Sequence, residues 1–152
     1  MKRMLVAGNW KMNKDIAESV ALVSEILSWL DGKDLKSKVL VCPPFTSIPA
    51  VQKLIENTSL LLGAQNCHYE SKGAYTGEIS PSMLKSAGCE YVIVGHSERR
   101  TYFFETDTLV NKKVIALLAH NLKPILCIGE TLDERNDDLT FDVIERQIQL
   151  GL

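Results

Sequence analysis

The sequence predicts an α/β fold built from five parallel strand–helix units, and two patterns support this prediction. Five short apolar runs do not alternate with polar residues, which is typical of parallel strands that are buried on both faces. These runs lie at residues 4–7, 39–42, 60–62, 91–94 and 125–128. Segments with helical periodicity separate them, and right-handed crossovers between parallel strands then favour one sheet with helices packed outside it.

The expected helices cover residues 16–30, 48–55, 81–87, 109–118 and 141–148. In the first helix, apolar residues recur every three or four positions, and Gly32 follows its end. Ser80 and Pro81 form a start signal for the third helix, because a capping side chain precedes a proline at the first helical position. Gly88 and Gly151 are the expected stops of the third and fifth helices.

Two connections are longer or more polar than the others. Residues 65–79 have no helical stripe, and a loop of this length is typical of a functional or mobile segment. Residues 132–140 form a polar segment before the last helix. Units of about thirty residues can form an open sheet or part of a closed eight-unit barrel of about 250 residues. We expect a single domain over residues 1–152.

The composition excludes several classes of protein. The net charge is −2, with 17 basic and 19 acidic residues, so there is no broad field to attract nucleic acid or an anionic membrane. The four cysteines have no metal-site or redox spacing, and we expect free thiols in a reducing, cytoplasmic setting. They are Cys42, Cys67, Cys89 and Cys127. No run is long enough for a transmembrane helix, and residues 4–8 are too short for the core of a signal peptide.

Candidate site residues follow the expected strands, because ligands of parallel α/β folds bind at the carboxyl ends of the strands. Lys11 is either a cation for a phosphate, carboxylate or developing oxyanion, or a surface lysine that pairs with Glu98. Asn9 lies on the same side of the extended chain and suits recognition of a hydroxyl or carbonyl group. No nucleotide-binding loop and no metal-ligand cluster occurs in the sequence.

His96 and its neighbours leave alternatives open. His96 is either a core histidine with both nitrogens satisfied or a neutral electrophile, since burial and a helix start both disfavour the imidazolium. Glu98 is either a general base or, as we favour, half of an ion pair with Lys11 or an arginine. We expect Arg99 and Arg100 to pair with carboxylates of neighbouring loops, and Glu130 is one candidate partner.

Taken together, the strand ends resemble those of triosephosphate isomerase from residue 4 to the end of the chain. The matching motifs are AGNWKMN at 7–13, GAQN at 63–66, GAYTGEIS at 73–80, YVIVGHSERR at 91–100 and CIGET at 127–131. The resemblance implies an incomplete TIM barrel, with five of the eight βα units. It also implies the glycolytic and gluconeogenic interconversion of dihydroxyacetone phosphate and D-glyceraldehyde 3-phosphate through an enediolate, with no cofactor.

The resemblance also implies roles for individual residues. Asn9 and Lys11 would bind the phosphorylated triose, with Lys11 also steadying the enediolate charge. His96 would polarise the carbonyl and shuttle protons between the two oxygens. Ser97 and Glu98 would support the site, Glu98 through Lys11.

Two further implications concern packing and assembly. Cys127 matches a position near the family's catalytic centre, where we expect it to pack. Family members are usually homodimers in which the long loop reaches into the partner's site. The dimer loop here is Tyr75, Thr76, Gly77 and Glu78, with Thr76 at its tip.

The sequence differs from the family in its length, because it stops at residue 152, before the family's sixth strand. The family's base is a glutamate after the sixth strand, and the lid and later phosphate loops also follow that point. We therefore expect the chain alone to be inactive and aggregated, oligomeric or partly disordered, unless a carboxyl-terminal segment complements it. The alternatives are a catalytically silent binding or oligomerisation module and an unrelated open-sheet enzyme of flavodoxin-like type.

Overall fold

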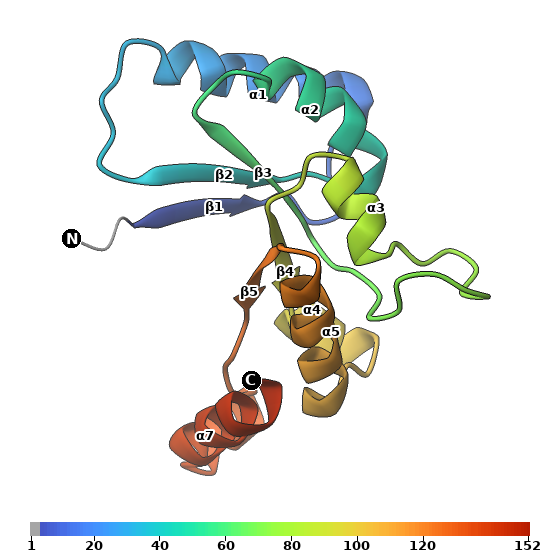
Figure 1. Cartoon of the computed structure of the whole chain (residues 1–152). Helices are drawn as coiled ribbons and strands as arrows, with labels where there is room; N and C mark the ends of the chain where they lie inside the picture. Colours follow the sequence, from blue (N-terminus) through green and yellow to red (C-terminus); the bar gives the residue numbers. More distant parts are fainter. Residues whose placement is uncertain (1–3) are drawn as a thin grey trace.

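A computed structural model describes residues 4–152, so the first three residues of the expected domain lie outside the described part. Five parallel strands form one open sheet in the order β1-β2-β3-β4-β5. The strands are β1 (Leu5–Asn9), β2 (Lys38–Cys42), β3 (Leu60–Ala64), β4 (Tyr91–Val94) and β5 (Lys123–Leu126). Figure 1 shows this half-barrel arrangement, with β1 and β5 at its two edges. The expected fold class is confirmed.

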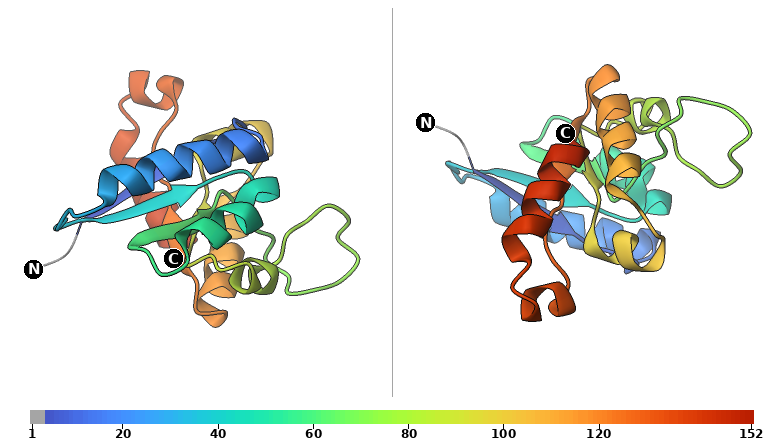
Figure 2. Two further views of the ribbon diagram at one scale, coloured as in Figure 1. Left: turned by 90° about the horizontal axis from the view of Figure 1, so that it is seen from above. Right: turned by 90° about the horizontal axis from the view of Figure 1, so that it is seen from below.

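All five expected helices are present, and three further short helices lie between them. The expected ones are α1 (Ile16–Leu30), α2 (Ile48–Ile55), α3 (Pro81–Ser86), α5 (Asp107–Ala119) and α7 (Thr140–Gly151). The additional ones are the 3-10 helix η1 (Phe45–Ser47), α4 (Ser97–Tyr102) and α6 (Leu132–Asn136). Figure 2 shows α1 and α2 side by side over the sheet. The helix α6 falls in the expected polar segment, where Thr131 and Glu134 form a capping box.

Most of the core lies between the helices and the outer face of the sheet. Val23 of α1, Val51 of α2 and Val110 of α5 are fully buried there, in one cluster with Val92 and Val94 of β4. A second cluster covers the concave face, where Leu40, Cys42 and Ile93 pack with partly buried neighbours. Successive strand residues point to opposite faces, so the continuous apolar runs supply both clusters.

The expectation that all strands are buried on both faces is wrong at the edge strand β1. Val6 of β1 is 57% exposed and Met4 just before it is 72% exposed. β1 hydrogen bonds only to β2, and β5 only to β4, so each has one unpaired edge in the described structure. Val6 lies beside Val39, which packs against the outer cluster, so its exposed side chain is on the outer face of the sheet. Ala7 lies beside Leu40 on the concave face and is exposed too.

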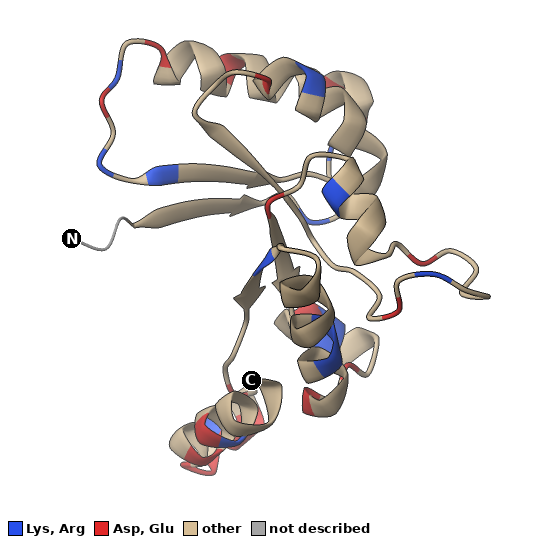
Figure 3. Ribbon diagram, viewed as in Figure 1, with Lys and Arg blue, Asp and Glu red and all other residues tan. Residues whose placement is uncertain are grey.

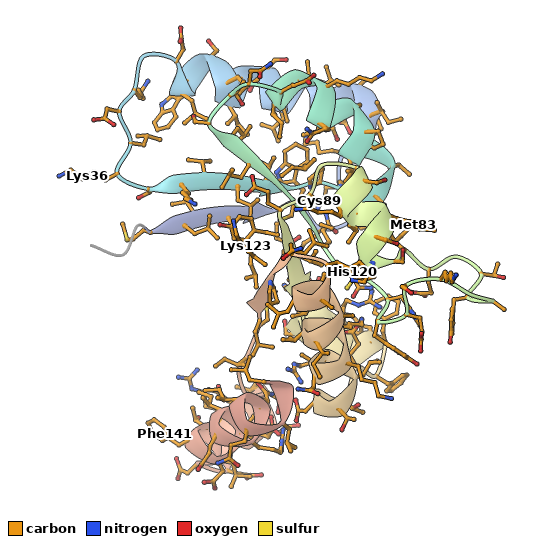
Figure 4. The ribbon with its side chains drawn as sticks, in the orientation of Figure 1. Lys36, Met83, Cys89, His120, Lys123 and Phe141 are labelled. Atoms are coloured by element: carbon orange, nitrogen blue, oxygen red, sulfur yellow. The ribbon has the colours of Figure 1, made fainter. Side chains whose placement is uncertain are left out.

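The apolar residues whose spacing predicts α7, Phe141, Ile144 and Ile148, do not form its most buried face. Val143, Gln147 and Gly151 are buried against the rest of the chain, whereas Phe141 is 85% exposed. Figure 4 shows Phe141 pointing away from the body of the structure. Gln147 occupies the buried face because its side-chain amide exchanges two hydrogen bonds with the backbone of Gly129.

Candidate functional site

The carboxyl ends of the strands surround a cavity of about 390 Å³, called here the site cavity. Its lining includes four of the expected site residues, Asn9, Lys11, His96 and Glu98. A smaller hollow of about 210 Å³ beside it is lined by His96, Ser97 and Cys127 among others. A larger open hollow of about 820 Å³ lies around Gly32 and Thr58 and contains none of the expected site residues.

The turn after β1 holds Lys11 in place through backbone contacts. Lys11 has a φ of 55°, and its N–H donates to the side-chain oxygen of Asn9 at 3.0 Å. The amide of Gln65 donates to the carbonyl oxygens of Lys11 and Cys42, each at 2.9 Å. Gln65 therefore joins the ends of β1 and β2 to the end of β3.

Lys11 and Glu98 form the expected ion pair. The Lys11 Nζ donates to Glu98 Oε1 at 2.6 Å, and both side chains remain about half exposed, at 50% and 42%. The hydrogen bond from Lys11 lowers the pKa of the Glu98 carboxyl below its usual value. Glu98 is therefore a carboxylate at neutral pH, and its charge is paired with that of Lys11.

His96 caps the short helix α4 and lines both cavities. Its Nδ1 accepts a hydrogen bond from the Glu98 N–H at 3.2 Å, and its side chain is 22% exposed. A nitrogen that accepts a hydrogen bond carries no proton, so the neutral ring has its proton on Nε2. The remaining nitrogen is then a donor that can serve a ligand in the cavity.

The two arginines do not pair with neighbouring loops as expected. Arg99 Nε donates to Glu105 at 2.5 Å, and Arg100 Nη1 donates to Asp107 at 2.5 Å, so both partners lie just beyond α4. Arg100 also donates to the backbone oxygens of Gly95 and Cys127, which ties it to the ends of β4 and β5.

Glu130, the carboxylate suggested for one of these arginines, pairs elsewhere. Thr140 Oγ1 donates to Glu130 Oε1 at 3.2 Å, and Arg135 Nη1 lies 3.4 Å from the same oxygen. The two arginines of the SERR motif therefore pair within one segment of the chain, because a short helix turns both of them back toward residues 105–107.

Cys127 and residues 75–78, the segment expected to contact a second copy, do not line the site cavity. Cys127 is partly buried and packs with the concave cluster, and burial raises the pKa of its thiol. Residues 70–78 are exposed, and Tyr75, Thr76, Gly77 and Glu78 lie in the loop that projects beyond α3 in Figure 1. This loop was expected to lack regular structure, and no helix or strand lies between β3 and α3.

Lys113 was missed from sequence. Gln65 and Asn66, which belong to the GAQN motif at the end of β3, line the cavity, and the buried Lys113 contacts Asn66. Lys113 had a signal, because it lies between Val110 and Leu117 on the buried stripe of α5. A lysine on such a stripe needs a buried partner. Within residues 4–152 no group of three or more His, Cys, Asp or Glu side chains is arranged to hold a metal ion.

Charges of both signs are interspersed over the helices and loops, as Figure 3 shows, and the site cavity combines Lys11, Glu98 and Arg99. In the described part of the chain no helix is long and apolar enough to cross a membrane. The arrangement can hold a small polar ligand between an ammonium group, a carboxamide and an imidazole N–H.

Comparison with known proteins places these features in one family. Residues 4–152 match the family model described as triosephosphate isomerase. The triosephosphate isomerase of Caldanaerobacter subterraneus subsp. tengcongensis is 53% identical over 152 residues, which are 100% of this chain and 60% of that protein. That of Aquifex aeolicus is 51% identical over 150 residues, covering 99% of this chain and 60% of the relative.

A solved structure agrees with the sequence relatives. The crystal structure of triosephosphate isomerase from Bartonella henselae has a TM-score of 0.94 and 40% identity, covering 99% of this chain and 62% of that one. The chain thus spans about 60% of the length of the curated relatives that it matches. On the model match and these relatives, the chain belongs to the triosephosphate isomerase family.

Proposed function

We propose that this chain supplies part of a site that interconverts dihydroxyacetone phosphate and D-glyceraldehyde 3-phosphate by proton transfer through an enediolate. One observation carries the proposal. Lys11 and His96 line the same cavity of about 390 Å³, and the hydrogen bond to His96 Nδ1 leaves Nε2–H free to donate. A fixed cation and a neutral donor beside one cavity suit an oxyanion that develops during the reaction.

In this proposal Asn9 and Lys11 bind the triose, and the Lys11 ammonium stabilises the negative charge of the enediolate. His96 polarises the substrate carbonyl through Nε2–H and moves protons between the two oxygens. Glu98 acts as a positioning residue, since it holds the Lys11 ammonium at 2.6 Å and its N–H orients the imidazole. Ser97 begins the helix that carries these contacts. The reaction is a proton shift and needs no cofactor.

We further propose that the base which removes the carbon-bound proton comes from a complementing carboxyl-terminal segment. Glu98 is the only carboxylate among the described residues that line the site cavity, and it is committed to Lys11. A positioned base contributes about 10²–10⁴-fold to a rate. The unpaired edges of β1 and β5 and the exposed Phe141 of α7 suit further chain that completes a single barrel domain.

An isomerase assay with D-glyceraldehyde 3-phosphate tests both parts of this proposal. The chain alone is compared with the chain mixed with a separately expressed segment, the carboxyl-terminal two fifths of the Caldanaerobacter relative. We expect no turnover above His96→Ala for the chain alone. We expect turnover in the mixture that His96→Ala and Lys11→Met each abolish. Turnover of the chain alone that His96→Ala abolishes would place the base within these residues, with Glu98 as its source.

We also propose that the projecting loop forms a contact with a second copy of the chain, with Thr76 at its tip. Residues 70–78 are exposed, and Tyr102 and Phe103, which line the site cavity, are 71% and 61% exposed. Phe104 beside them is 82% exposed, so an apolar rim is available to receive such a loop. Sedimentation of the chain and of Thr76→Arg tests the contact, and a variant that associates as strongly as the original would contradict it.

A catalytically silent module that only associates is the second candidate. The exposed Val6, Phe104 and Phe141 favour association whether or not turnover occurs. The mixing experiment separates the two functions, because a silent module would bind the complementing segment without producing any His96-dependent turnover.

A further inference from the structure

A buried ionic cluster lies behind the site cavity, and none of the roles proposed above uses it. We call Asn66, Arg99, Glu105 and Lys113 the Lys113 cluster. Lys113 of α5 is 3% exposed, and its Nζ donates to Asn66 Oδ1 at 2.7 Å and also to Glu105 Oε1. Arg99 Nε donates to the same Glu105 oxygen at 2.5 Å.

The cluster connects two segments that are far apart in the sequence. Asn66 is the second residue of the long loop that follows β3, whereas Arg99 lies on α4 with Glu98. Asn66 and Arg99 both line the site cavity, and no hydrogen bond or ion pair joins them directly. Lys113 and Glu105, which are not among the lining residues, bridge them from behind.

The bridge completes a ring of contacts around the cavity. The side-chain amide of Gln65 donates to the backbone oxygen of Lys11, and the Lys11 ammonium group donates to Glu98. Glu98 lies on the same short helix, α4, as Arg99. Arg99 and Lys113 both donate to Glu105, and Lys113 also donates to Asn66. Asn66 follows Gln65 in the sequence, so the ring of contacts closes there. The ring therefore gives an unbroken path of contacts between the two segments.

Packing alone does not account for the cluster. A buried ion pair is weak evidence for stability, since two apolar side chains of similar volume often stabilise a fold as well or better. Burial raises the pKa of the Glu105 carboxyl, but hydrogen bonds from Lys113 and Arg99 outweigh burial and lower the pKa overall. The second carboxylate oxygen, Oε2, has no hydrogen-bond partner among the described residues. A hydrogen-bonded ion pair fixes the relative positions of its two side chains, which an apolar pair does not.

We infer that Lys113 and Glu105 are positioning residues that couple the start of the long loop to the helix carrying Glu98 and Arg99. That this coupling serves a catalytic site rests on the proposed function. The coupling itself is measurable without turnover, so its failure and the failure of the isomerase proposal are distinguishable.

Hydrogen–deuterium exchange of two backbone amides reads out the coupling. The His68 N–H donates to Ile79 O across the long loop, and the Glu105 N–H donates to Arg99 O after α4. We expect Lys113→Met to speed exchange at both amides by about tenfold, the effect of losing hydrogen bonds to a charged group. Arg146→Met is the control, because it breaks an ion pair of α7 with Asp107 and removes no contact of α4 or of the long loop. We expect it to leave the exchange of His68 unchanged.

Asn66→Ala keeps the proposal testable if Lys113→Met does not fold. This variant preserves the ion pairs of Glu105, and we expect faster exchange at the distant Glu105 amide as well as at His68. Asn66→Asp retains the Oδ1 acceptor and should restore slow exchange at both amides. Acceleration at His68 alone, or equal acceleration of amides throughout α1 and β2, would overturn the inference in favour of a purely local or a general structural effect.

Discussion

Lys11 Nζ lies 2.6 Å from Glu98 Oε1, although 87 positions separate the two residues in the sequence. The contact joins the turn after β1 to the helix after β4, so it depends on the whole intervening sheet being formed. It also fixes the charge of Glu98, because the hydrogen bond from Lys11 lowers the pKa of that carboxyl.

The first prediction concerns the titration of Glu98. Its pKa in the folded chain lies below the unfolded value, so the ion pair stabilises the fold above the unfolded pKa and is lost as the pH falls through the folded pKa. We expect carbon NMR of the Glu98 carboxyl to give a midpoint that Lys11→Met raises. Lys14→Met is the control, since Lys14 also has a positive φ, 76° against 55° for Lys11. An equal midpoint in all three proteins would mean that Lys11 does not hold Glu98 in solution.

The second prediction concerns the tautomers of the three histidines. Nδ1 of His96 and Nδ1 of His68 each accept a backbone N–H, from Glu98 and Glu70 respectively. Nδ1 of His120 instead lies 2.7 Å from the carbonyl oxygen of Ala116, which can only accept. Nitrogen NMR at a pH where the rings are neutral should therefore find the proton on Nε2 in His96 and His68, and on Nδ1 in His120. A proton on Nδ1 of His96 would remove the donor on which the proposed function depends.

The fold could be predicted from sequence because its signals are local and repeat along the chain. The stripe of α1 and the capped start of α3 each specify a helix within one segment, and the helices are found at Ile16–Leu30 and Pro81–Ser86. Alternation of strands and helices then leaves one parallel arrangement. Burial at the edges was missed, since the exposure of Val6 depends on what lies beside β1 and not on its sequence.

The candidate site was only partly predictable, because its contacts join distant segments. The gathering of Asn9, Lys11, His96 and Glu98 followed from the rule that strand ends meet at one edge of the sheet. The prediction of ion-pair partners for Arg99 and Arg100 was wrong. The direction of both side chains is set by the geometry of α4, which the prediction did not consider. Whether these residues perform the proposed roles stays a prediction.

The third prediction concerns the glycine that precedes His96. Gly95 has a φ of +67°, and an added Cβ would lie 2.9 Å from Arg100 Nη2 and 3.1 Å from Val110 Cγ2. Gly32 has the same φ of +67° with nothing within 4 Å, so Gly32→Ala measures the backbone strain alone. We expect Gly32→Ala to lower the free energy of unfolding by about 1 kcal/mol, and Gly95→Ala to lower it by a further 1–3 kcal/mol or so from crowding. Urea unfolding is the measurement, and equal losses would show that Arg100 moves aside freely.

The fourth prediction concerns the thiols, which report on how open the concave face is. Burial raises the pKa of Cys42, Cys67 and Cys89 to about 12, while the thiol of Cys127 is only partly buried. Since the thiolate is the reacting species, we expect a disulfide reagent at pH 8 to label one thiol of the folded chain quickly and the others only on unfolding. Cys127→Ser should abolish the fast phase. A fast phase that survives this substitution would mean that reagent reaches Cys42 on the concave face past the unpaired edge of β1, so that the open side of the sheet is more accessible than the structure indicates.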